Sequence, residues 1–364
     1  MKIVFWHRHL VLQGPEGFLD RLLLGVLIPL GWLYGLVVLF RAALYRWGIL
    51  PSFRASVPVL SVGNITAGGT GKTPVVDALL KHFLAQGLRV AVVSRGYGGS
   101  LREGVGVVSA GEGPQLAADL CGDEPFLLAR RNPQALILVA RKRADGIRTA
   151  VERYQAELII LDDGFQHLAV QRDVDILLLD GNNPLGNGQV LPAGLLREFP
   201  PALKRANLLV FTRCPEGTSR PQPSRLCAEK PFFYSRHVLA SEAISLAGEV
   251  VPLTSLETKK GVVFAGIADP ASFFEALGAK GLRLAENLAL SDHVVYDNQL
   301  LKRLRSLAEG ADYLITTEKD AVKLGRTDFS VPCYQVPLAV QLFDEEGFFQ
   351  KLHQLIPGRD HDPE

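Results

Sequence analysis

The residues best suited to chemistry are Lys72 and Thr73, which end the glycine-rich stretch TAGGTGKT. This stretch departs from the phosphate-binding pattern G-x-x-x-x-G-K-[ST] at one position, where Thr66 replaces the first glycine. Glycines let backbone N–H groups converge on phosphate oxygens, a lysine reaches the β- and γ-phosphates, and a hydroxyl can ligate Mg²⁺. We therefore expect a nucleoside triphosphate to bind Thr66, Ala67, Gly68, Gly69, Thr70, Gly71, Lys72 and Thr73, with Thr73 also a ligand of Mg²⁺.

A second acidic site follows the apolar stretch Leu158–Leu161, which runs directly into Asp162 and Asp163. A strand that ends in an acid is typical of the carboxylate that holds Mg²⁺ beside a phosphate-binding loop, directly or through water. The alternative is an ordinary acid in a turn after a strand. Because the chain also carries the loop, we expect both carboxylates to be metal ligands.

Two further groups could provide a base. Asp123 and Glu124 begin an expected helix, and His293 lies in the segment SDHVVYD. A carboxylate and an imidazole together could orient or accept the proton of an acceptor hydroxyl near neutral pH. The competing explanations are that the acids complement a helix dipole and that the histidine is structural. The residues alone leave open whether Asp123 and His293 meet.

Alternating strands and helices are expected to position these groups. The loop lies between an expected strand at Val57–Val62 and a helix that begins at Lys72, and a strand at Leu88–Val93 follows. Further strands are expected at Leu158–Leu161, Val174–Leu179, Leu208–Thr212, Val262–Ala265, Arg283–Leu290 and Tyr313–Thr316, with helices at Ala271–Leu277 and Asp297–Leu307. This order predicts an α/β protein with a parallel, doubly wound sheet in each half.

The expected fold is a P-loop NTPase-like parallel sheet flanked by helices, with a second, smaller α/β domain and an N-terminal membrane-associated helix. We expect four segments: a membrane-associated segment at 1–48, the nucleotide-binding core at 49–212, a connecting segment at 213–260 and the smaller domain at 261–364. Within the core, the glycine- and proline-rich stretch 181–201 is expected to be a functional loop.

The membrane expectation rests on Leu22–Phe40, a run of 19 residues without a charge. As a helix it would measure about 28 Å, close to the thickness of the bilayer hydrocarbon. Trp6, Tyr45 and Trp47 flank the run, where amphipathic rings favour the interface. A cleaved signal peptide is disfavoured because the run is long and begins late. A buried core helix and a helix lying in one leaflet both remain open, the latter because Pro29 interrupts the run.

Composition excludes several classes. The 364-residue chain has a net charge of +1, so no electrostatic argument for nucleic-acid binding arises. Its four cysteines have no C-x-x-C spacing, which disfavours a disulfide framework or a zinc site. Free thiols in a large chain suit a reducing compartment.

With these motifs in view, the chain resembles the tetraacyldisaccharide 4′-kinases of lipid A biosynthesis over nearly its whole length. The resemblance rests on the ordered segments SVGNITAGGTGKTP (61–74), SRGYGG (94–99), GDEP (122–125), LDDGFQH (161–167), LPAGLLRE (191–198), FAGIADPASFF (264–274), SDHVVYD (291–297) and TTEKDAVK (316–323). The family's histidine segment often reads DHH, whereas Val294 stands at the second position here.

The resemblance implies that the γ-phosphate of ATP moves to the 4′-hydroxyl of a tetraacylated glucosamine disaccharide 1-phosphate, giving lipid IVA. It implies ATP and Mg²⁺ as cofactors, the bacterial inner membrane as the location and a catalytic body on the cytoplasmic side. Asp123 would be the base, supported by His293. The matching motifs also place Asp162, Asp163 and Glu198 at the metal, and Gln166 and His167 at the nucleotide, with Arg197 nearby. Neither a nucleic acid nor an obligate protein partner is expected.

Two other classes of protein would explain part of these sequence features. A membrane-associated P-loop ATPase switch with protein partners would need the loop, the acids and the apolar run, but not His293 or the LPAGLLRE segment. A soluble P-loop ligase would treat the apolar run as core.

Overall fold

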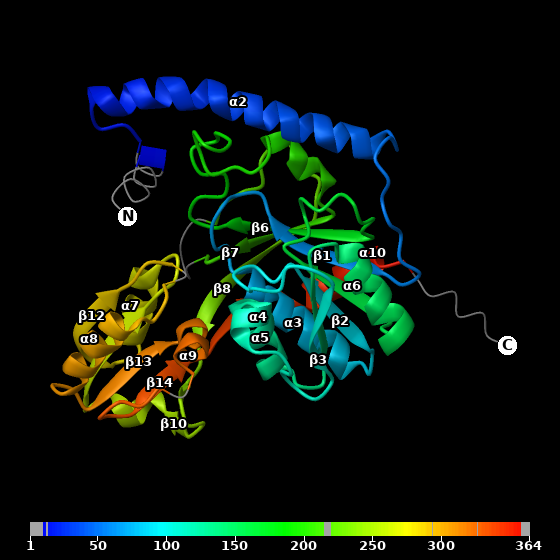
Figure 1. The fold of residues 1–364 in the computed structure, drawn as a ribbon. Coiled ribbons are helices and arrows are strands. Elements are labelled where there is room, and N and C mark those ends of the chain that lie inside the picture. The colour runs from blue at the N-terminus through cyan, green and yellow to red at the C-terminus, as the bar shows by residue number, and fades with distance from the viewer. Residues whose placement is uncertain (1–9, 12–13, 215–219, 293, 326, 358–364) are drawn as a thin grey trace. The chain divides into compact units, whose positions relative to one another are not determined.

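The computed structural model describes residues 10–11, 14–214, 220–292, 294–325 and 327–357 of the chain. The chain divides into two compact units (Figure 1). The first takes in Met1–Arg95, Lys142–Arg236 and Gln341–Glu364, and the second takes in Gly96–Arg141 and His237–Val340.

The first unit is built on parallel strands. In spatial order these are β8 (Phe232–Leu239), β7 (Leu208–Thr212), β6 (Val174–Asp180), β1 (Val59–Asn64), β5 (Leu158–Asp162) and β2 (Val90–Ser94). Every residue of β1, β2, β5 and β7 is buried, as expected for parallel strands covered on both faces. The predicted parallel sheet is confirmed, and its register sets β1 beside β5, with Val62 opposite Asp162.

Helices complete this unit. They are α2 (Phe18–Arg46), α3 (Lys72–Ala85), α6 (Arg143–Arg148), which continues as a π-helical turn at Thr149–Arg153, the 3₁₀ helix η2 (Pro200–Arg205) and α10 (Glu345–Leu355). Helix α3 begins at Lys72, as its apolar spacing predicted. It packs against the sheet of this unit and buries Val76, Leu80 and Phe83.

The second unit contains two sets of strands. Strands β3 (Val105–Ala110) and β4 (Leu136–Ala140) pair antiparallel, and the short helices α4 (Ala118–Cys121) and α5 (Asp123–Arg131) lie between them in the chain. A six-stranded sheet has the order β10 (Val250–Pro252), β9 (Glu242–Ser245), β14 (Cys333–Val336), β13 (Tyr313–Thr317), β11 (Lys260–Ala265) and β12 (Arg283–Ala289). Its remaining elements are α7 (Pro270–Ala279), α8 (Asn298–Ala308), α9 (Glu318–Leu324) and the 3₁₀ turn Leu253–Leu256, and β15 (Leu338–Leu342) follows β14.

We expected a parallel sheet in the second half of the chain, and this was wrong for the strands at one edge of the six-stranded sheet. Strands β11 to β14 are parallel, but β9 pairs antiparallel with both β10 and β14. A short turn at Gly248, whose φ is 95°, joins β9 to β10, and only antiparallel neighbours can be joined so tightly. The stretch 213–260, expected as a connection, therefore carries β8, β9 and β10.

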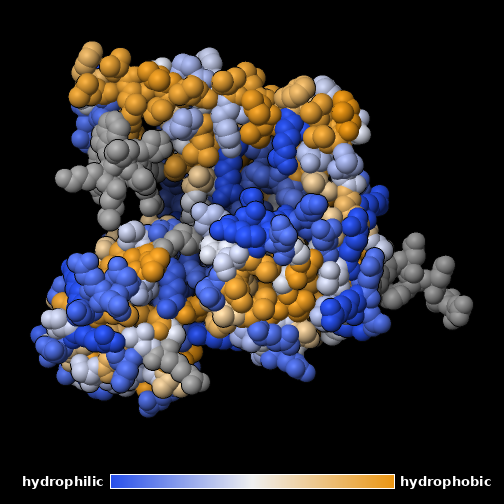
Figure 2. Space-filling model, in the orientation of Figure 1, coloured by the Kyte–Doolittle hydropathy of each residue, from blue (hydrophilic) through white to orange (hydrophobic). Residues whose placement is uncertain are grey.

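Helix α2 is apolar and largely exposed. It runs for 29 residues through Pro29, and Gly31 and Gly35 are its buried residues. Phe18 is 80% exposed, Trp32 58% and Phe40 61%, and Figure 2 shows hydrophobic residues along the length of the helix. Among the described helices, it is the one long and apolar enough to cross a membrane. A core helix would bury these side chains, so that alternative does not fit.

Candidate functional site

Glycine allows the phosphate-binding loop its backbone shape. Gly71 caps the start of α3 with φ 77°, and Gly68 has φ 121°, both in the region that L side chains avoid. Gly63 serves a different purpose, because a Cβ there would lie 2.5 Å from the Cβ of Phe165. The loop after β1 and the loop after β5 can therefore lie close together.

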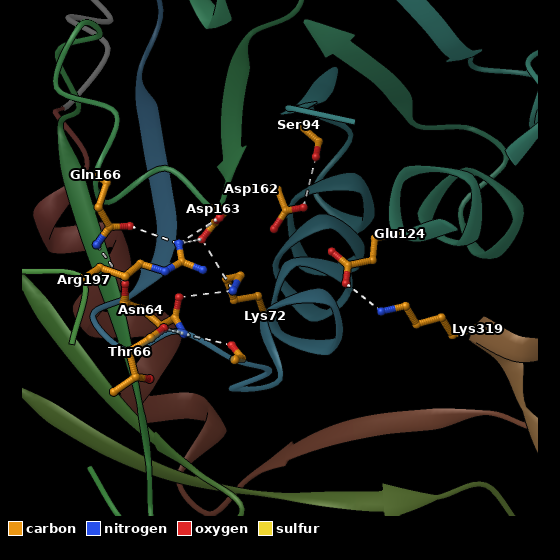
Figure 3. Close-up of polar contacts among 11 residues, drawn as sticks. Asn64, Thr66, Lys72, Ser94, Glu124, Asp162, Asp163, Gln166, Arg197 and Lys319 are labelled. Atoms are coloured by element: carbon orange, nitrogen blue, oxygen red, sulfur yellow. Dashed lines mark hydrogen bonds and ion pairs between the residues drawn. The ribbon is translucent and has the colours of Figure 1, made fainter. Parts of the chain in front are cut away.

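Asn64 braces the inside of the loop (Figure 3). Its Nδ2 atom donates to the carbonyl oxygens of Thr66, at 2.7 Å, and Gly68, at 3.3 Å. Its Oδ1 atom accepts a hydrogen bond from Nζ of Lys72 at 3.1 Å. One buried side chain thus holds both the loop backbone and the lysine that the sequence predicted to reach phosphate. The motif rule names no residue at this position, so sequence reasoning missed Asn64.

Asp163, which directly follows β5, forms an ion pair with Lys72. Nζ of Lys72 lies 3.5 Å from Oδ1 of Asp163, and Nη1 of Arg197 donates to both carboxylate oxygens. Burial alone would raise the pKa of Asp163, but Lys72 and Arg197 outweigh it and hold that pKa below its usual value. Asp163 also has φ 53°, an uncommon conformation for a non-glycine residue that turns the chain sharply after β5.

Asp162 is more deeply buried, at 2% exposed, and accepts a hydrogen bond from Oγ of Ser94 at 3.3 Å. Arg143 begins α6 and is 3% exposed. Burial lowers the pKa of its guanidinium to about 10, while the charges of Asp162 and Asp163 favour its ionised form. The buried guanidinium of Arg143 therefore interacts electrostatically with both aspartates.

Gln166 and His167 follow in the loop after β5. Nε2 of Gln166 donates to the carbonyl oxygen of Asn64 at 3.0 Å, and its Oε1 lies 3.4 Å from Nη1 of Arg197. Burial and the charge of Arg143 lower the pKa of His167 to about 4, so its imidazole is neutral at pH 7. Gln166 thus contacts both predicted loops directly.

Glu198 has a different partner from the one expected. Both of its carboxylate oxygens accept hydrogen bonds from Arg205, at 2.7 and 2.8 Å, and the side chain is buried. The same guanidinium lies 4.4 Å from the ring centroid of Phe165 and donates to the Phe165 carbonyl. This pairing occupies the carboxylate that was expected at the metal, so we leave Glu198 out of the metal site proposed below.

Residues from other segments also form hydrogen bonds with the backbone of the phosphate-binding loop. Oγ1 of Thr212, at the end of β7, donates to the carbonyl oxygen of Thr70 at 2.8 Å. Arg213 donates to the carbonyl oxygen of Gly69 at 2.5 Å and to Asp180 at 2.9 Å. On the other side, the backbone N–H of Ala67 donates to Leu195 in the LPAGLLRE segment. No motif predicted Thr212 or Arg213, although both lie where β7 ends at the edge that binds ligands in such sheets.

The second unit holds the expected base. Asp123 and Glu124 begin α5, as predicted, and α9 supplies a lysine to each. Nζ of Lys323 lies 3.5 Å from Oδ2 of Asp123. Nζ of Lys319 lies 3.6 Å from Oε1 of Glu124, and Figure 3 shows this second pair. His293 lies outside the described residues. The TTEKDAVK segment thus provides cations to the two acids of GDEP.

The donors suit a magnesium nucleotide. The carboxylates of Asp162 and Asp163 and the hydroxyl of Thr73, in the first turn of α3, are the hard oxygen ligands that Mg²⁺ prefers. Mg²⁺ usually takes its other ligands from substrate phosphates and water, so it needs few protein oxygens. The buried Oγ1 of Thr70 has no hydrogen-bond partner in the described part of the protein. With Lys72, Arg143, Arg197 and Arg213 around it, the loop fits a polyanion.

Comparisons with known proteins point the same way. Residues 23–357 match the family described as tetraacyldisaccharide-1-P 4′-kinase. A tetraacyldisaccharide 4′-kinase of Syntrophotalea carbinolica is 49% identical over 358 residues, which cover 98% of this chain and 99% of that protein. One from Geobacter metallireducens is 47% identical over 309 residues, covering 84% of this chain and 90% of that protein. The crystal structure of LpxK from Aquifex aeolicus, described as an "apo" form in complex with ATP, superposes with a TM-score of 0.76 at 29% identity, covering 92% of this chain and all of that one.

Proposed function

We propose residue roles from one premise: this chain belongs to the tetraacyldisaccharide 4′-kinase family. It is an ATP-dependent kinase that phosphorylates a hydroxyl group of the lipid A precursor, and it uses Mg²⁺. In the proposed reaction the acceptor is the 4′-hydroxyl of a tetraacylated glucosamine disaccharide 1-phosphate and the product is lipid IVA. One observation carries the assignment of roles: Lys72, which begins α3 after the loop that follows β1, lies 3.5 Å from Asp163, which directly follows the adjacent strand β5.

The chemistry is a transfer of one phosphoryl group. The acceptor oxygen attacks the γ-phosphorus, the bond from that phosphorus to the β–γ bridging oxygen breaks, and ADP leaves. The hydroxyl proton passes to the carboxylate of Asp123, and His293 supports that base. Thr73, Asp162 and Asp163 would hold Mg²⁺, which would supply positive charge to neutralise the charge that develops on the phosphates.

The remaining groups position ATP. The backbone N–H groups of 66–73 and the ammonium of Lys72 bind phosphate oxygens, since a helix N-terminus and a cation both favour anions. Arg197 and Gln166 keep Asp163 in place through the contacts described above. Because phosphoryl transfer needs alignment and charge neutralisation more than covalent catalysis, this set of roles is sufficient.

We place the enzyme at the bacterial inner membrane with its catalytic body on the cytoplasmic side. Two facts support this: α2 exposes large apolar side chains along 29 residues, and ATP is cytoplasmic. The acyl chains of the acceptor would stay in the bilayer while its sugar meets the protein at the surface. As stretches of the chain, we propose that 1–48 is the membrane-associated segment, 49–212 the nucleotide-binding core, 213–260 the connection and 261–364 the smaller domain. The two compact units cross these boundaries, because 96–141 belongs to the second unit and 341–364 to the first. No protein partner is needed for this reaction.

The test is a transfer assay with γ-labelled ATP and the tetraacyl disaccharide 1-phosphate in detergent. Mg²⁺-dependent appearance of label in the lipid supports the acceptor. ATP hydrolysis that ignores the lipid, without labelled lipid, would instead indicate an ATPase switch.

The role of the base is tested with two neighbouring carboxylates. Asp123→Asn should lower kcat by about 10²–10⁴-fold with little change in ATP binding. Glu124→Gln, which removes the adjacent acid at the same helix end, is the matched control and should retain most activity. If the two variants behave alike, Asp123 is not the base.

The membrane assignment is tested by deleting residues 1–46, which removes α2. The truncated protein should leave the membrane fraction, whereas retention would show that another surface provides the anchor.

A further inference from the structure

Three polar side-chain ends converge where α3 and α10 finish, away from the nucleotide site. Nε2 of His82 lies 3.0 Å from Nε2 of His353, and the side-chain amide of Gln86 lies 2.8 Å from the first and 3.2 Å from the second. His82 is in the last turn of α3 and Gln86 is its C-cap, so the two share one face of the helix at the i, i+4 spacing. His353 comes from the last turn of α10.

The three contacts among His82, His353 and Gln86 cannot all be hydrogen bonds at the same time. A neutral imidazole nitrogen either donates one proton or accepts at one lone pair. If one histidine donates to the other, no lone pair remains there for Gln86. If both histidines present lone pairs to the Gln86 amide, those lone pairs face each other across 3.0 Å. No assignment of protons makes all three contacts favourable.

A bound cation resolves the conflict. The oxygen and nitrogen of a glutamine amide are assigned from their surroundings, so a flip of Gln86 presents Oε1 to both histidines. Three ligand atoms on one face of an octahedron, each about 2.1 Å from the metal, lie about 3.0 Å apart. The observed separations of 2.8, 3.0 and 3.2 Å match that spacing.

We propose that His82, His353 and Gln86 form a facial binding site for a divalent first-row transition ion such as Ni²⁺, Co²⁺ or Zn²⁺. Imidazole nitrogens select these ions over Mg²⁺ and Ca²⁺, and the three remaining positions of the octahedron would take water. The donor set resembles two histidines and one carboxylate, with an amide oxygen in place of the acid.

The site is partly preorganised. The ring of His82 stacks on Phe349 of α10, with centroids 3.5 Å apart and planes 5° from parallel, which fixes its direction. The ion would bridge the end of the helix that Lys72 begins to the C-terminal helix, and a ligand that binds only the folded state stabilises it.

The site is distinct from the catalytic one. His82 lies ten residues after Lys72 on the same helix, a distance of about 15 Å along the axis. The proposal therefore concerns stability and metal content, and it requires no change in the reaction.

The experiment uses the tag-free, full-length protein in detergent, stripped with a chelator and then titrated with Co²⁺ or Ni²⁺ by calorimetry. One ion should bind per chain and raise the midpoint of thermal unfolding, and bound Co²⁺ should give the weak visible absorption of an octahedral complex. His82→Gln and His353→Gln should each weaken binding by about tenfold or more, and Gln86→Glu should strengthen it by about tenfold, because a carboxylate is a better ligand.

The double variant His7→Gln/His9→Gln is the control for the chain's other closely spaced histidines, and it should bind as the unaltered protein does. Unchanged affinity in His82→Gln, or no gain in Gln86→Glu, would overturn the proposal. Because the glutamate variant predicts a gain, a folding defect in the histidine variants does not leave the question open.

Discussion

Nη1 of Arg197 donates hydrogen bonds to both carboxylate oxygens of Asp163, at 3.0 and 3.1 Å. Arg197 comes from the loop after β6, and Asp163 follows β5, so the contact joins two segments that are 34 residues apart in the chain. The LPAGLLRE loop thus acts on the acid that we place at the metal, and it does so through charge.

Replacing Arg197 should shift the pH dependence of the enzyme. Asp163 has a lowered pKa because Lys72 and Arg197 offset its burial, so losing Arg197 raises that pKa. In Arg197→Met the acidic limb of kcat/KM should move to higher pH, and kcat/KM at pH 7 should fall by about 10²-fold. Arg197→Lys, which keeps a charge, should lie between the two. A fall in activity with an unmoved acidic limb would contradict this role.

Arg213 should matter for both ATP binding and backbone strain. Arg213 donates a hydrogen bond to the carbonyl oxygen of Gly69. Its own φ is 59°, in the left-handed region that residues with a side chain rarely adopt. Arg213→Ala and Arg213→Gly should each raise KM for ATP by about tenfold, because one charge-assisted hydrogen bond to the loop is lost. Arg213→Gly should nevertheless be more stable than Arg213→Ala by about 1 kcal/mol in the free energy of unfolding. Equal stability of the two variants would show that the strain is not significant.

Glu198 and Arg205 should behave as one unit. Arg205→Met leaves the buried carboxylate of Glu198 without its partner, so it should lower the free energy of unfolding by about 3 kcal/mol. Glu198→Gln leaves a guanidinium that is 27% exposed and can be solvated, so it should lower that free energy by only about 1 kcal/mol. The double variant should recover part of that loss. The Mg²⁺ concentration for half-maximal activity should be the same in Glu198→Gln as in the unaltered protein. A marked rise in that concentration would return Glu198 to the metal site.

Two glycines of α2 provide a matched pair. A Cβ at Gly35 would lie 2.4 Å from the ring of Phe199, whereas one at Gly25 would meet nothing within 4 Å. Alanine raises helix propensity at both positions by about 1 kcal/mol, but at Gly35 overpacking should cost about 1–3 kcal/mol. Gly35→Ala should therefore loosen the loop 185–199 and lower kinase activity, while Gly25→Ala should not. Limited proteolysis within that loop measures the first effect, and equal cleavage in both variants would argue against tight packing there.

Much of the scaffold was predictable because its signals are local. The apolar runs at 158–161, 174–179 and 208–212 became β5, β6 and β7 almost residue for residue, and α3 begins at the predicted Lys72. Short antiparallel strands such as β9 and β10 escaped because a strand of only three or four residues that is partly exposed resembles an ordinary turn region. The side chains that support the loop from other strands, Thr212 and Arg213, escaped because no spacing rule links β7 to residues 142 and 144 positions earlier.

The sequence alone determined the chemistry of this protein: a glycine loop with Lys72 and Thr73, acids after β5 and a set of ordered motifs that identify the family. Those features depend on residue type and on neighbours in the chain. Tertiary structure decided which charges meet, because ion pairs form between residues that folding brings together. Folding pairs Asp163 with Lys72 and Arg197, and it pairs Glu198 with Arg205. It also brings His82 into contact with His353, which lies 271 positions later in the chain.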